Sequence, residues 1–384
     1  MDQPTAELLV SEDGARALAV AAAQPDPTSL AAAAALRTHF PADLAAAALQ
    51  QIALRRKGET KLGPLAQRLF LTDAGLQQAT RPVLARWRAG LIAAAAPAAK
   101  VADLGCGLGI DALALLDAGL RIRPVELDPV TAVLASANLG VEVERADGAD
   151  LTLTDELVYC DPARRAGARR SWRIEDLSPS WATVTALLDR APGGCVKLGP
   201  GAPHDLLADD WQAHWVGIGN DAVELTVLTG RLADPGRRAV TLLAADGTAE
   251  EFRPTAAGPA PLSALQDRIH EPHPAVIAAR AVDSLAAAHG WARLSPGIAY
   301  LTGEGEGRPW ARSFQVREVL PLKEKLLRSW VRQHRIGTVE IKKRGVEVDP
   351  AELRRRLRPR GTGAATLILT PTAEGAVAVV VDRL

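Results

Sequence analysis

The chain has 384 residues, more than the roughly 100 to 200 of one ordinary domain, which predicts two or three domains. Its formal net charge is 0, 48% of its residues are hydrophobic and 4% are aromatic, as is typical of a soluble protein with cores of Ala, Leu and Val. The apolar runs are shorter than the ~20 residues that cross a bilayer. The chain begins Met1-Asp2-Gln3, without the pattern of a secretory signal, and its 3 cysteines and 7 histidines lack metal-ligand spacing. We therefore expect a cytoplasmic protein with no membrane span and no metal, and the oligomeric state stays open.

The segment 1–97 is rich in Ala, Leu, Arg and Gln, and its apolar residues recur every three or four positions, which predicts a helical N-terminal domain. From Lys100 onward, short apolar runs alternate with helix-length segments, the pattern of a parallel sheet with crossover helices. We therefore expect a doubly wound α/β domain over 98–231, a connecting region that is partly β over 232–302, and a small α+β domain over 303–384.

Individual elements follow from the apolar runs and the helix-start signals. Strands are predicted at 101–104, 122–126, 141–145, 157–160, 195–198 and 222–229. Helices are predicted at 110–118, 129–138 and 179–190. A hairpin is predicted over 239–252, with its turn at Asp246-Gly247.

The C-terminal segment has the predicted order strand, helix, strand, helix, strand. Its pieces are 313–319, 322–334, 338–343, 350–357 and 365–370. The segment 323–360 holds 13 Lys or Arg and 5 Asp or Glu, although the whole chain is neutral. This uneven charge indicates a polyanionic partner for the C-terminal part.

The strongest motif is DLGCGLGID at 103–111, in which an apolar strand opens into a glycine loop and then a helix. Gly105, Gly107 and Gly109 let the backbone approach a ligand closely. Ile110 stands where a dinucleotide-binding loop usually has its third glycine, and no Gly-Lys-Ser/Thr follows. The sequence therefore matches neither the dinucleotide-binding loop nor the Gly-Lys-Ser/Thr phosphate-binding loop completely.

Two carboxylates, Asp103 and Asp111, flank this glycine loop. They would repel a pyrophosphate, whereas S-adenosylmethionine carries an ammonium and a sulfonium and has no phosphate. The local charge therefore favours a cationic cofactor.

Further carboxylates follow the next strands. Glu126 lies 23 positions after Asp103, where a carboxylate can bind both ribose hydroxyls of S-adenosylmethionine or, equally, of NAD. Asp147 and Asp161 follow the third and fourth predicted strands. Because ligands of open parallel sheets sit at the carboxyl ends of the strands, these four side chains should converge on one crevice.

The motifs DLGCGLGID, VELDP, ADGAD and YCDPARR together resemble the class I S-adenosylmethionine-dependent methyltransferases. The motifs AYLTG, SFQVREVLP and VEIKKRGVEVDPAELRRRL resemble a bacterial subfamily of these enzymes that has a C-terminal THUMP-like domain. The resemblance covers most of the chain. It implies a Rossmann-like doubly wound sheet, S-adenosylmethionine as cofactor, and RNA as a partner.

The resemblance also implies roles for residues. Asp103 and the glycine loop would hold the methionine end of the cofactor, Glu126 the ribose, and Asp147 the adenine amino group. The predicted cofactor-binding residues are Asp103, Gly105, Gly107, Gly109, Asp111, Glu126 and Asp147.

Asp161-Pro162 matches the place where many nucleic-acid methyltransferases carry Asn/Asp-Pro-Pro-aromatic, whose polar groups accept hydrogen bonds from the nitrogen that is methylated. The candidate catalytic residues are Asp161, Pro162 and Arg164. Ala163 and Arg164 replace the second proline and the aromatic residue, so the loop itself offers no ring for base stacking.

Two questions near this loop stay open in the sequence. Trp172 could stack on a base while Arg164, Arg165, Arg169 and Arg170 meet phosphates, or the segment could be a mobile basic loop with the tryptophan in the core. Cys160 could be a nucleophile or, as we favour, a buried structural thiol.

Three functions remain after these arguments. The first is an RNA methyltransferase whose basic C-terminal domain binds phosphates. The second is a methyltransferase that acts on a protein or a small molecule. The third is a non-catalytic RNA-binding protein that has kept the fold, against which the intact run of motifs from Asp103 to Asp161 argues.

Overall fold

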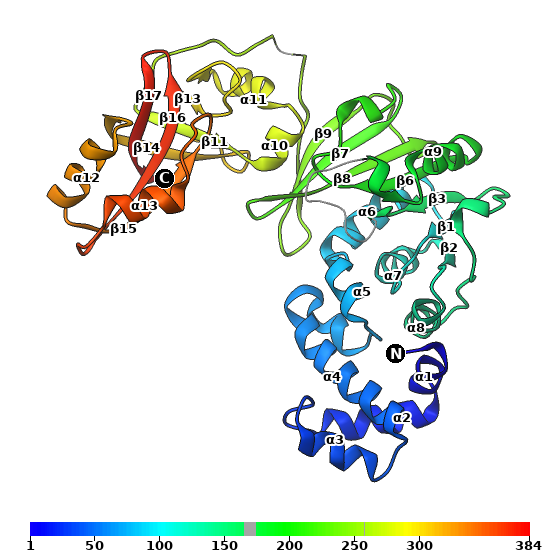
Figure 1. The fold of residues 1–384 in the computed structure, drawn as a ribbon. Coiled ribbons are helices and arrows are strands. Elements are labelled where there is room, and N and C mark those ends of the chain that lie inside the picture. Colours follow the sequence, from blue (N-terminus) through cyan, green and yellow to red (C-terminus); the bar gives the residue numbers. More distant parts are fainter. Residues whose placement is uncertain (165–173, 257) are drawn as a thin grey trace. The chain divides into compact units, whose positions relative to one another are not determined.

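The computed structural model describes residues 1–164, 174–256 and 258–384. The chain divides into two compact units, each of which is described by itself (Figure 1). The first comprises Met1–Ala213, Leu225–Arg237 and Leu243–Thr248, and the second comprises His214–Glu224, Arg238–Leu242 and Ala249–Leu384. Within the described ranges, no helix is both long enough and apolar enough to span a membrane. The domain boundaries at residues 97, 231 and 302 stay predictions.

The chain before residue 100 is helical, as the three-four periodicity predicts. Its helices are α1 (Gln3–Leu9), α2 (Glu12–Ala22), α3 (Leu30–Arg37), α4 (Ala42–Leu62), the short 3-10 helix η1 (Gly63–Gln67), α5 (Asp73–Gln78) and α6 (Pro82–Ala95). Ser11, Ser29 and Thr72 begin α2, α3 and α5 by accepting a hydrogen bond from a backbone N–H of the first turn. Small alanine and leucine side chains of α2, α3 and α4 form a common core, as the low aromatic content requires.

An eight-stranded sheet follows, with the order β10-β9-β7-β8-β6-β3-β1-β2. Its strands are β1 (Lys100–Leu104), β2 (Arg121–Val125), β3 (Leu157–Cys160), β6 (Gly193–Leu198), β7 (Gln212–Ile218), β8 (Asp221–Gly230), β9 (Arg238–Leu243) and β10 (Ala249–Phe252). Strands β2, β1, β3 and β6 are parallel, and β8 pairs antiparallel with β6. The parallel strands are the doubly wound part that the sequence predicts.

Helices cover both faces of the parallel strands (Figure 1). They are α7 (Ile110–Asp117), α8 (Pro129–Leu139) and α9 (Trp181–Arg190), with the short helices η2 (Gly148–Asp150), η3 (Ile174–Asp176) and η4 (His204–Leu206) between strands. α6 and α7 share a core with Val101, Leu157 and Tyr159. α9 approaches β6 closely at Gly194, where an added Cβ would lie 2.3 Å from Leu188.

One predicted strand is absent. The segment 141–145 makes a single isolated bridge, between Glu144 and Val125, and forms no strand. Its alternation predicts one buried face, and Val143 is indeed buried, but Val141 stays 38% exposed. The segment lies beside β2 at the edge of the sheet, where no further strand holds it in register.

The second unit is built on a seven-stranded sheet with the order β12-β13-β11-β14-β17-β16-β15. Its strands are β11 (Arg268–Pro272), β12 (Ala292–Arg293), β13 (Leu301–Thr302), β14 (Ala311–Pro321), β15 (Ile336–Lys343), β16 (Gly363–Thr372) and β17 (Gly375–Arg383). Its helices are α10 (Pro274–Ala278), α11 (Val282–His289), α12 (Glu324–Gln333) and α13 (Pro350–Leu357). The predicted order strand, helix, strand, helix, strand is confirmed from β14 to β16, and β17 is a strand that the sequence reading missed.

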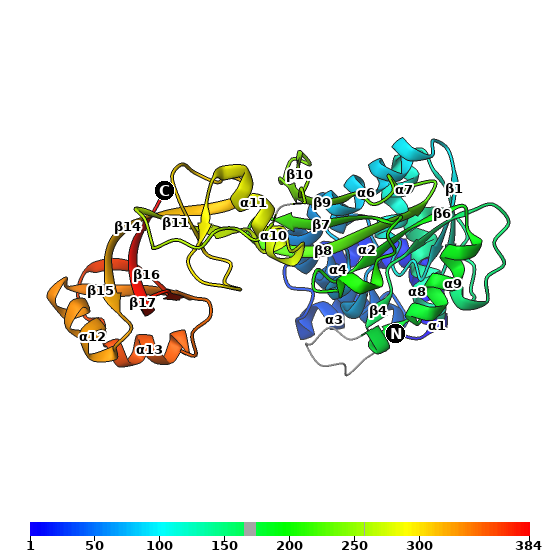
Figure 2. The same cartoon turned by 90° about the horizontal axis from the view of Figure 1, so that it is seen from above.

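The two faces of this sheet are covered differently (Figure 2). α12 and α13 pack on one face through a core that includes Leu327, Leu353 and Ile341. The other face carries a second core with Phe314, Ile368 and Val379. Strand alternation separates the two sets, because Ile341 and Lys342 point to opposite faces of β15.

Candidate active site

The glycine loop joins β1 to α7, as predicted. Gly105, Gly107 and Gly109 have φ of 72°, 55° and 81°, which an L side chain rarely adopts. An added Cβ at Gly105 or Gly107 would meet nothing within 4 Å, so the backbone there borders open space. At Gly109 an added Cβ would lie 2.9 Å from Cγ of Leu139, so this glycine lets α8 pack against the start of α7.

Asp103 lies at the end of β1 and is 2% exposed. Its Oδ2 atom has no hydrogen-bond partner within the described residues. Burial raises the pKa of Asp103 well above its ordinary value, and the negative charges of Asp111, Asp161 and Glu126 raise it further. These interactions place Asp111, Asp161 and Glu126 close to Asp103, whereas Asp147, the fourth member of the predicted set, is not among the charges that act on Asp103.

Asp111, in the first turn of α7, is held by groups from the N-terminal helices. Its carboxylate accepts a hydrogen bond of 2.7 Å from Oγ1 of Thr80 and forms an ion pair with Arg88 of α6. Arg88 is 1% exposed, and its Nε also donates to the hydroxyl of Tyr159 at 2.9 Å. Burial acts to raise the pKa of Asp111, but Arg88 and Lys197 hold it below its ordinary value. Asp111 therefore anchors α7 to α6.

Asp161 follows β3 and forms an ion pair with Lys197 of β6. The lysine Nζ also donates a hydrogen bond of 3.1 Å to Oγ1 of Thr80. The side chain of Asp161 keeps 37% of its surface exposed. Desolvation by the surrounding protein nevertheless raises the pKa of Asp161, with Lys197 opposing the rise and Asp111 adding to it. Asp161 is thus a fixed carboxylate with one face open to solvent.

Glu126 follows β2 and supports the glycine loop from the side. Its Oε2 accepts a hydrogen bond of 3.0 Å from the backbone N–H of Gly107, and its Oε1 accepts one of 2.9 Å from the N–H of Asp128. Each carboxylate oxygen has a further lone pair with which it can accept a ligand hydroxyl. Asp128 caps α8 by accepting from the N–H of Thr131 at 2.8 Å.

Asp147 is exposed and begins the short helix η2, where its Oδ1 accepts from the N–H of Ala149 at 2.9 Å. It reaches the carboxyl edge from a loop, since no strand precedes it. The following residue, Gly148, lies against Leu104, and an added Cβ would be 3.3 Å from the Cβ of that leucine.

Comparison with known proteins decides what kind of protein carries this group of carboxylates. The chain is 33% identical over 341 residues to an uncharacterized S-adenosylmethionine-dependent methyltransferase of Mycobacterium tuberculosis, found in strains CDC 1551 and H37Rv. The match covers 84% of this chain and 92% of the relative. The chain belongs to the S-adenosylmethionine-dependent methyltransferase family. It is an enzyme of that family, and S-adenosylmethionine is its cofactor.

Further comparisons define the parts of the methyltransferase. Residues 311–383 match the family described as THUMP domain-like, and residues 2–58 match a domain of unknown function. The crystal structure of a Porphyromonas gingivalis W83 protein assigned as a methyltransferase superposes with a TM-score of 0.76 at 23% identity, over 96% of this chain and 98% of that chain. This likeness shows the shared fold, and the family matches confirm the resemblance from the motifs.

The carboxylates at the carboxyl edge of the parallel strands fit a cationic cofactor. Asp103 offers a buried oxygen without a hydrogen-bond partner among the described residues, and its pKa is raised first by burial and then by the repulsion of neighbouring carboxylates. An ammonium or a sulfonium would satisfy that oxygen and offset the repulsion, whereas a pyrophosphate would increase it. Glu126 alone fits S-adenosylmethionine and NAD equally well. Asp103 favours S-adenosylmethionine, because it would attract a cation and repel a pyrophosphate.

The segment after Asp161 is described only in part. Pro162 is buried, and β4 (Ala163–Arg164) pairs antiparallel with β5 (Leu177–Ser178). The predicted roles of Arg165, Arg169, Arg170 and Trp172 lie outside the described residues. The role of Arg164 stays a prediction.

Cys160 is fully buried, and burial raises the pKa of its thiol. A thiol that resists ionisation is a poor nucleophile, which supports a structural part for Cys160. No group of three potential metal ligands occurs within the described residues.

Sequence reasoning missed three members of the site. Thr80 and Arg88 belong to the N-terminal helical segment and have no motif of their own. Lys197 did carry a signal, because it is the one charged residue in the otherwise apolar strand Gly193–Leu198.

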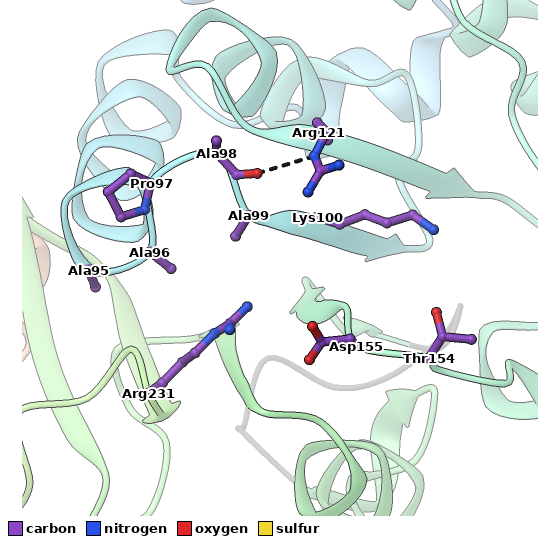
Figure 3. Close-up of a pocket in the computed structure, with 10 residues that line it drawn as sticks. All are labelled: Ala95, Ala96, Pro97, Ala98, Ala99, Lys100, Arg121, Thr154, Asp155 and Arg231. Carbon is purple, nitrogen blue, oxygen red and sulfur yellow. Dashed lines mark hydrogen bonds between the residues drawn. The ribbon is translucent and has the colours of Figure 1, made fainter.

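A separate hollow of about 480 Å³ lies at the opposite edge of the sheet (Figure 3). Lys100 at the start of β1, Arg121 at the start of β2, and Arg231 line it. The Nε of Arg121 donates a hydrogen bond of 3.2 Å to the carbonyl of Ala98. Because it lies at the amino ends of the parallel strands, this hollow is not part of the cofactor crevice.

Proposed function

We propose that this methyltransferase transfers its methyl group to RNA and that the THUMP-like segment binds the RNA backbone. The observation that carries the proposal is a set of exposed cations that form no ion pair within the described residues. They lie on or beside α12 and α13 and are Lys323, Lys325, Arg332, Arg335, Arg355, Arg358 and Arg360. We call this set the helical basic surface.

Local acidic residues neutralise only part of the charge on this side of the domain. Glu324 pairs with Arg328, and Glu352 pairs with Arg356. The seven cations of the helical basic surface are left over. When such a surface binds a polyanion, counterions condensed on the polyanion are released into solution, so the affinity falls steeply as the salt concentration rises.

S-adenosylmethionine supplies the methyl group, which its sulfonium makes electrophilic. Asp103 and the Gly105 to Gly109 loop would hold its methionine end, Glu126 its ribose, and Asp147 its adenine. Asp103 supports this assignment with its unsatisfied oxygen, and Gly105 and Gly107 with open space beside their backbone.

We assign to Asp161 the role of accepting a hydrogen bond from the attacking group of the substrate. A nitrogen nucleophile on a base needs a hydrogen-bond acceptor that orients its lone pair, and a carboxylate fixed on one side supplies it. Lys197 fixes that side through its ion pair with Asp161, and Thr80 in turn accepts from Lys197. Lys197 is a positioning residue in this proposal.

Methyl transfer from radiolabelled S-adenosylmethionine to total bacterial RNA, total protein and a small-molecule extract tests the substrate class. We expect label in RNA, and label confined to protein or to the extract would overturn the proposal. The double variant Lys325→Glu/Arg332→Glu should weaken RNA binding by roughly tenfold or more at 50 mM salt and less at 200 mM.

The matched control is Arg37→Glu/Arg68→Glu, which reverses two exposed cations of the first unit. It should keep most of the RNA affinity, and both variants should bind S-adenosylmethionine as the wild type does. Equal losses in the two double variants would show that the helical basic surface has no special role.

A further inference from the structure

The second unit contains a cavity of about 620 Å³ that the cofactor crevice does not use. Its volume lies within the ~300 to 1,000 Å³ of small-molecule sites. Its charged lining residues are Arg308, Arg312, Lys342, Arg344, Arg383 and Glu271. Five cations thus line the cavity with one carboxylate side chain, an excess of positive charge that favours an anion.

The cations come from separate strands and meet on one face of the seven-stranded sheet. Arg312 points to the same side of β14 as Phe314, and Lys342 is paired in register with Ile368. Phe314 and Ile368 belong to the core on the face opposite α12 and α13. The cavity is therefore distinct from the helical basic surface, which lies over the other face.

An ion pair shows that this face is concave. Lys342 on β15 and Glu271 on β11 are 2.7 Å apart, although β14, β17 and β16 lie between their strands. At roughly 4.8 Å between neighbouring strands, a flat sheet would separate them by about 19 Å, beyond the combined reach of the two side chains. The sheet must curl so that its two sides approach each other around the cavity.

Most charges in the cavity have partners, but one does not. Glu271 lies 2.7 Å from Lys342 and 4.0 Å from Arg344, and Arg383 pairs with Glu340 at 2.7 Å. Arg312, which is partly buried, makes no side-chain hydrogen bond or ion pair with any residue that the structure describes. A guanidinium presents several N–H donors in a fork that matches a phosphate.

We propose that this cavity binds a phosphate group of a single-stranded RNA segment, with the Arg312 guanidinium as its main ligand. The inference rests on the proposed RNA substrate and deepens it, because it adds a discrete phosphate site to the diffuse helical basic surface. RNA is favoured because the cavity and the helical basic surface lie on two faces of the same domain, and a flexible polyanion can occupy both. A ligand with several phosphate groups along one chain can bind both faces at once.

Fluorescence anisotropy with a labelled single-stranded oligoribonucleotide tests the site on the full chain. We expect Arg312→Ala to weaken binding at least tenfold, and Arg312→Lys to lose less because it keeps the charge but not the fork. The comparator is Arg355→Ala, which removes one of seven similar cations of the helical basic surface and should cost threefold or less.

A second measurement reports on the phosphate itself. Inorganic phosphate, added in place of chloride at constant ionic strength, should displace RNA from the wild type and from Arg355→Ala. Arg312→Ala should respond only to ionic strength. A melting temperature and S-adenosylmethionine affinity equal to wild type would show that Arg312→Ala is folded.

The two proposals can fail separately. If the wild type binds RNA but Arg312→Ala is weakened no more than Arg355→Ala, or still responds to phosphate, the cavity site is wrong and the RNA substrate stands. If the wild type binds no RNA, both fall. If a phosphopeptide binds through Arg312 while RNA does not, the cavity serves a protein ligand and this inference is overturned.

Discussion

A carboxylate is buried at the amino ends of the parallel strands and another at their carboxyl ends, and the pKa values of the two are shifted in opposite directions. Glu156, at the amino edge, is fully buried and pairs with Lys100 at 2.8 Å and with Arg123 at 3.4 Å. Burial acts to raise the pKa of Glu156, but hydrogen bonds from Lys100 and Thr154 hold it at about 2. Asp103, at the carboxyl edge, is 2% exposed, and its pKa is raised well above normal.

This difference separates a stabilising site from a binding site. Glu156 has its partners in the protein, so its charge adds to the stability of the fold. Among the described residues, one oxygen of Asp103 has no hydrogen-bond partner and the group lies among other carboxylates, so its charge costs stability until a cation binds. The charge of Asp103 at the carboxyl edge is therefore available to a ligand, whereas the charge of Glu156 at the amino edge stabilises the fold.

The largest effect should come from Asp161, the partly exposed carboxylate that follows β3 at the carboxyl edge. We expect Asp161→Asn to lower single-turnover methyl transfer by about 100-fold or more, because a positioned acceptor is worth roughly 10² to 10⁴ in rate. S-adenosylmethionine affinity should stay within about twofold. Asp150→Asn, which changes an exposed carboxylate of η2, is the matched control. Transfer by Asp161→Asn within threefold of that control would remove Asp161 from the mechanism.

Asp103 should destabilise the protein in the absence of cofactor. Its pKa is raised in the folded state, so the folded protein binds this proton more tightly than the unfolded chain, and stability is lost as pH rises through the folded pKa. Asp103→Asn should therefore unfold at higher urea than wild type, by about 1 to 3 kcal/mol at pH 8, with a smaller difference at pH 5. A variant less stable than wild type at both values would show that the carboxylate has a protein partner after all.

Glu156 should behave in the opposite sense. Its pKa is lowered to about 2, so its stabilising contribution is present above the unfolded value and is lost as pH falls toward 2. Glu156→Gln should cost about 1 to 2 kcal/mol at pH 7, a range reduced for solvent screening because Lys100 is 46% exposed. Urea unfolding from pH 7 to pH 3 should show the gap closing, and a constant gap would contradict the ion-pair account.

The smallest effect concerns the acid limb of the pH–rate profile. Desolvation raises the pKa of Asp161 and Lys197 opposes the rise, so removing the lysine should raise this pKa further. We expect Lys197→Met to move the acid limb of kcat/KM to higher pH, whereas Lys197→Arg should restore the wild-type limb in part. A fall in rate without any shift would mean that Lys197 acts only through local structure.

The residues of the carboxyl edge that belong to short sequence motifs could be predicted from the sequence. The glycine loop, Glu126 and Asp161 each follow a short apolar strand, and strand ends of a parallel sheet must share an edge. Arg88 was not predictable, because it reaches Asp111 from a helix that precedes the sheet in sequence and only the folded packing brings them together. A sequence motif contains residues that are close together in the chain, whereas an ion pair such as Arg88–Asp111 joins residues that are far apart in it.

Two strand predictions failed, one at the edge of a sheet and one inside a sheet. The alternation over 141–145 is typical of a half-buried strand, yet the segment has only the edge strand β2 beside it and stays irregular. β17 lies between β14 and β16 and pairs with both, although 365–370 was the last strand predicted from the sequence.

The most direct test of the account is titration calorimetry of S-adenosylmethionine into wild type, Asp103→Asn and Glu156→Gln at pH 7. We expect Asp103→Asn to weaken binding roughly 10- to 100-fold, the effect of losing a charge-assisted hydrogen bond, and Glu156→Gln to bind as wild type does. Equal affinity in all three proteins would contradict the claim that the unpaired carboxylate of the carboxyl edge holds the cofactor.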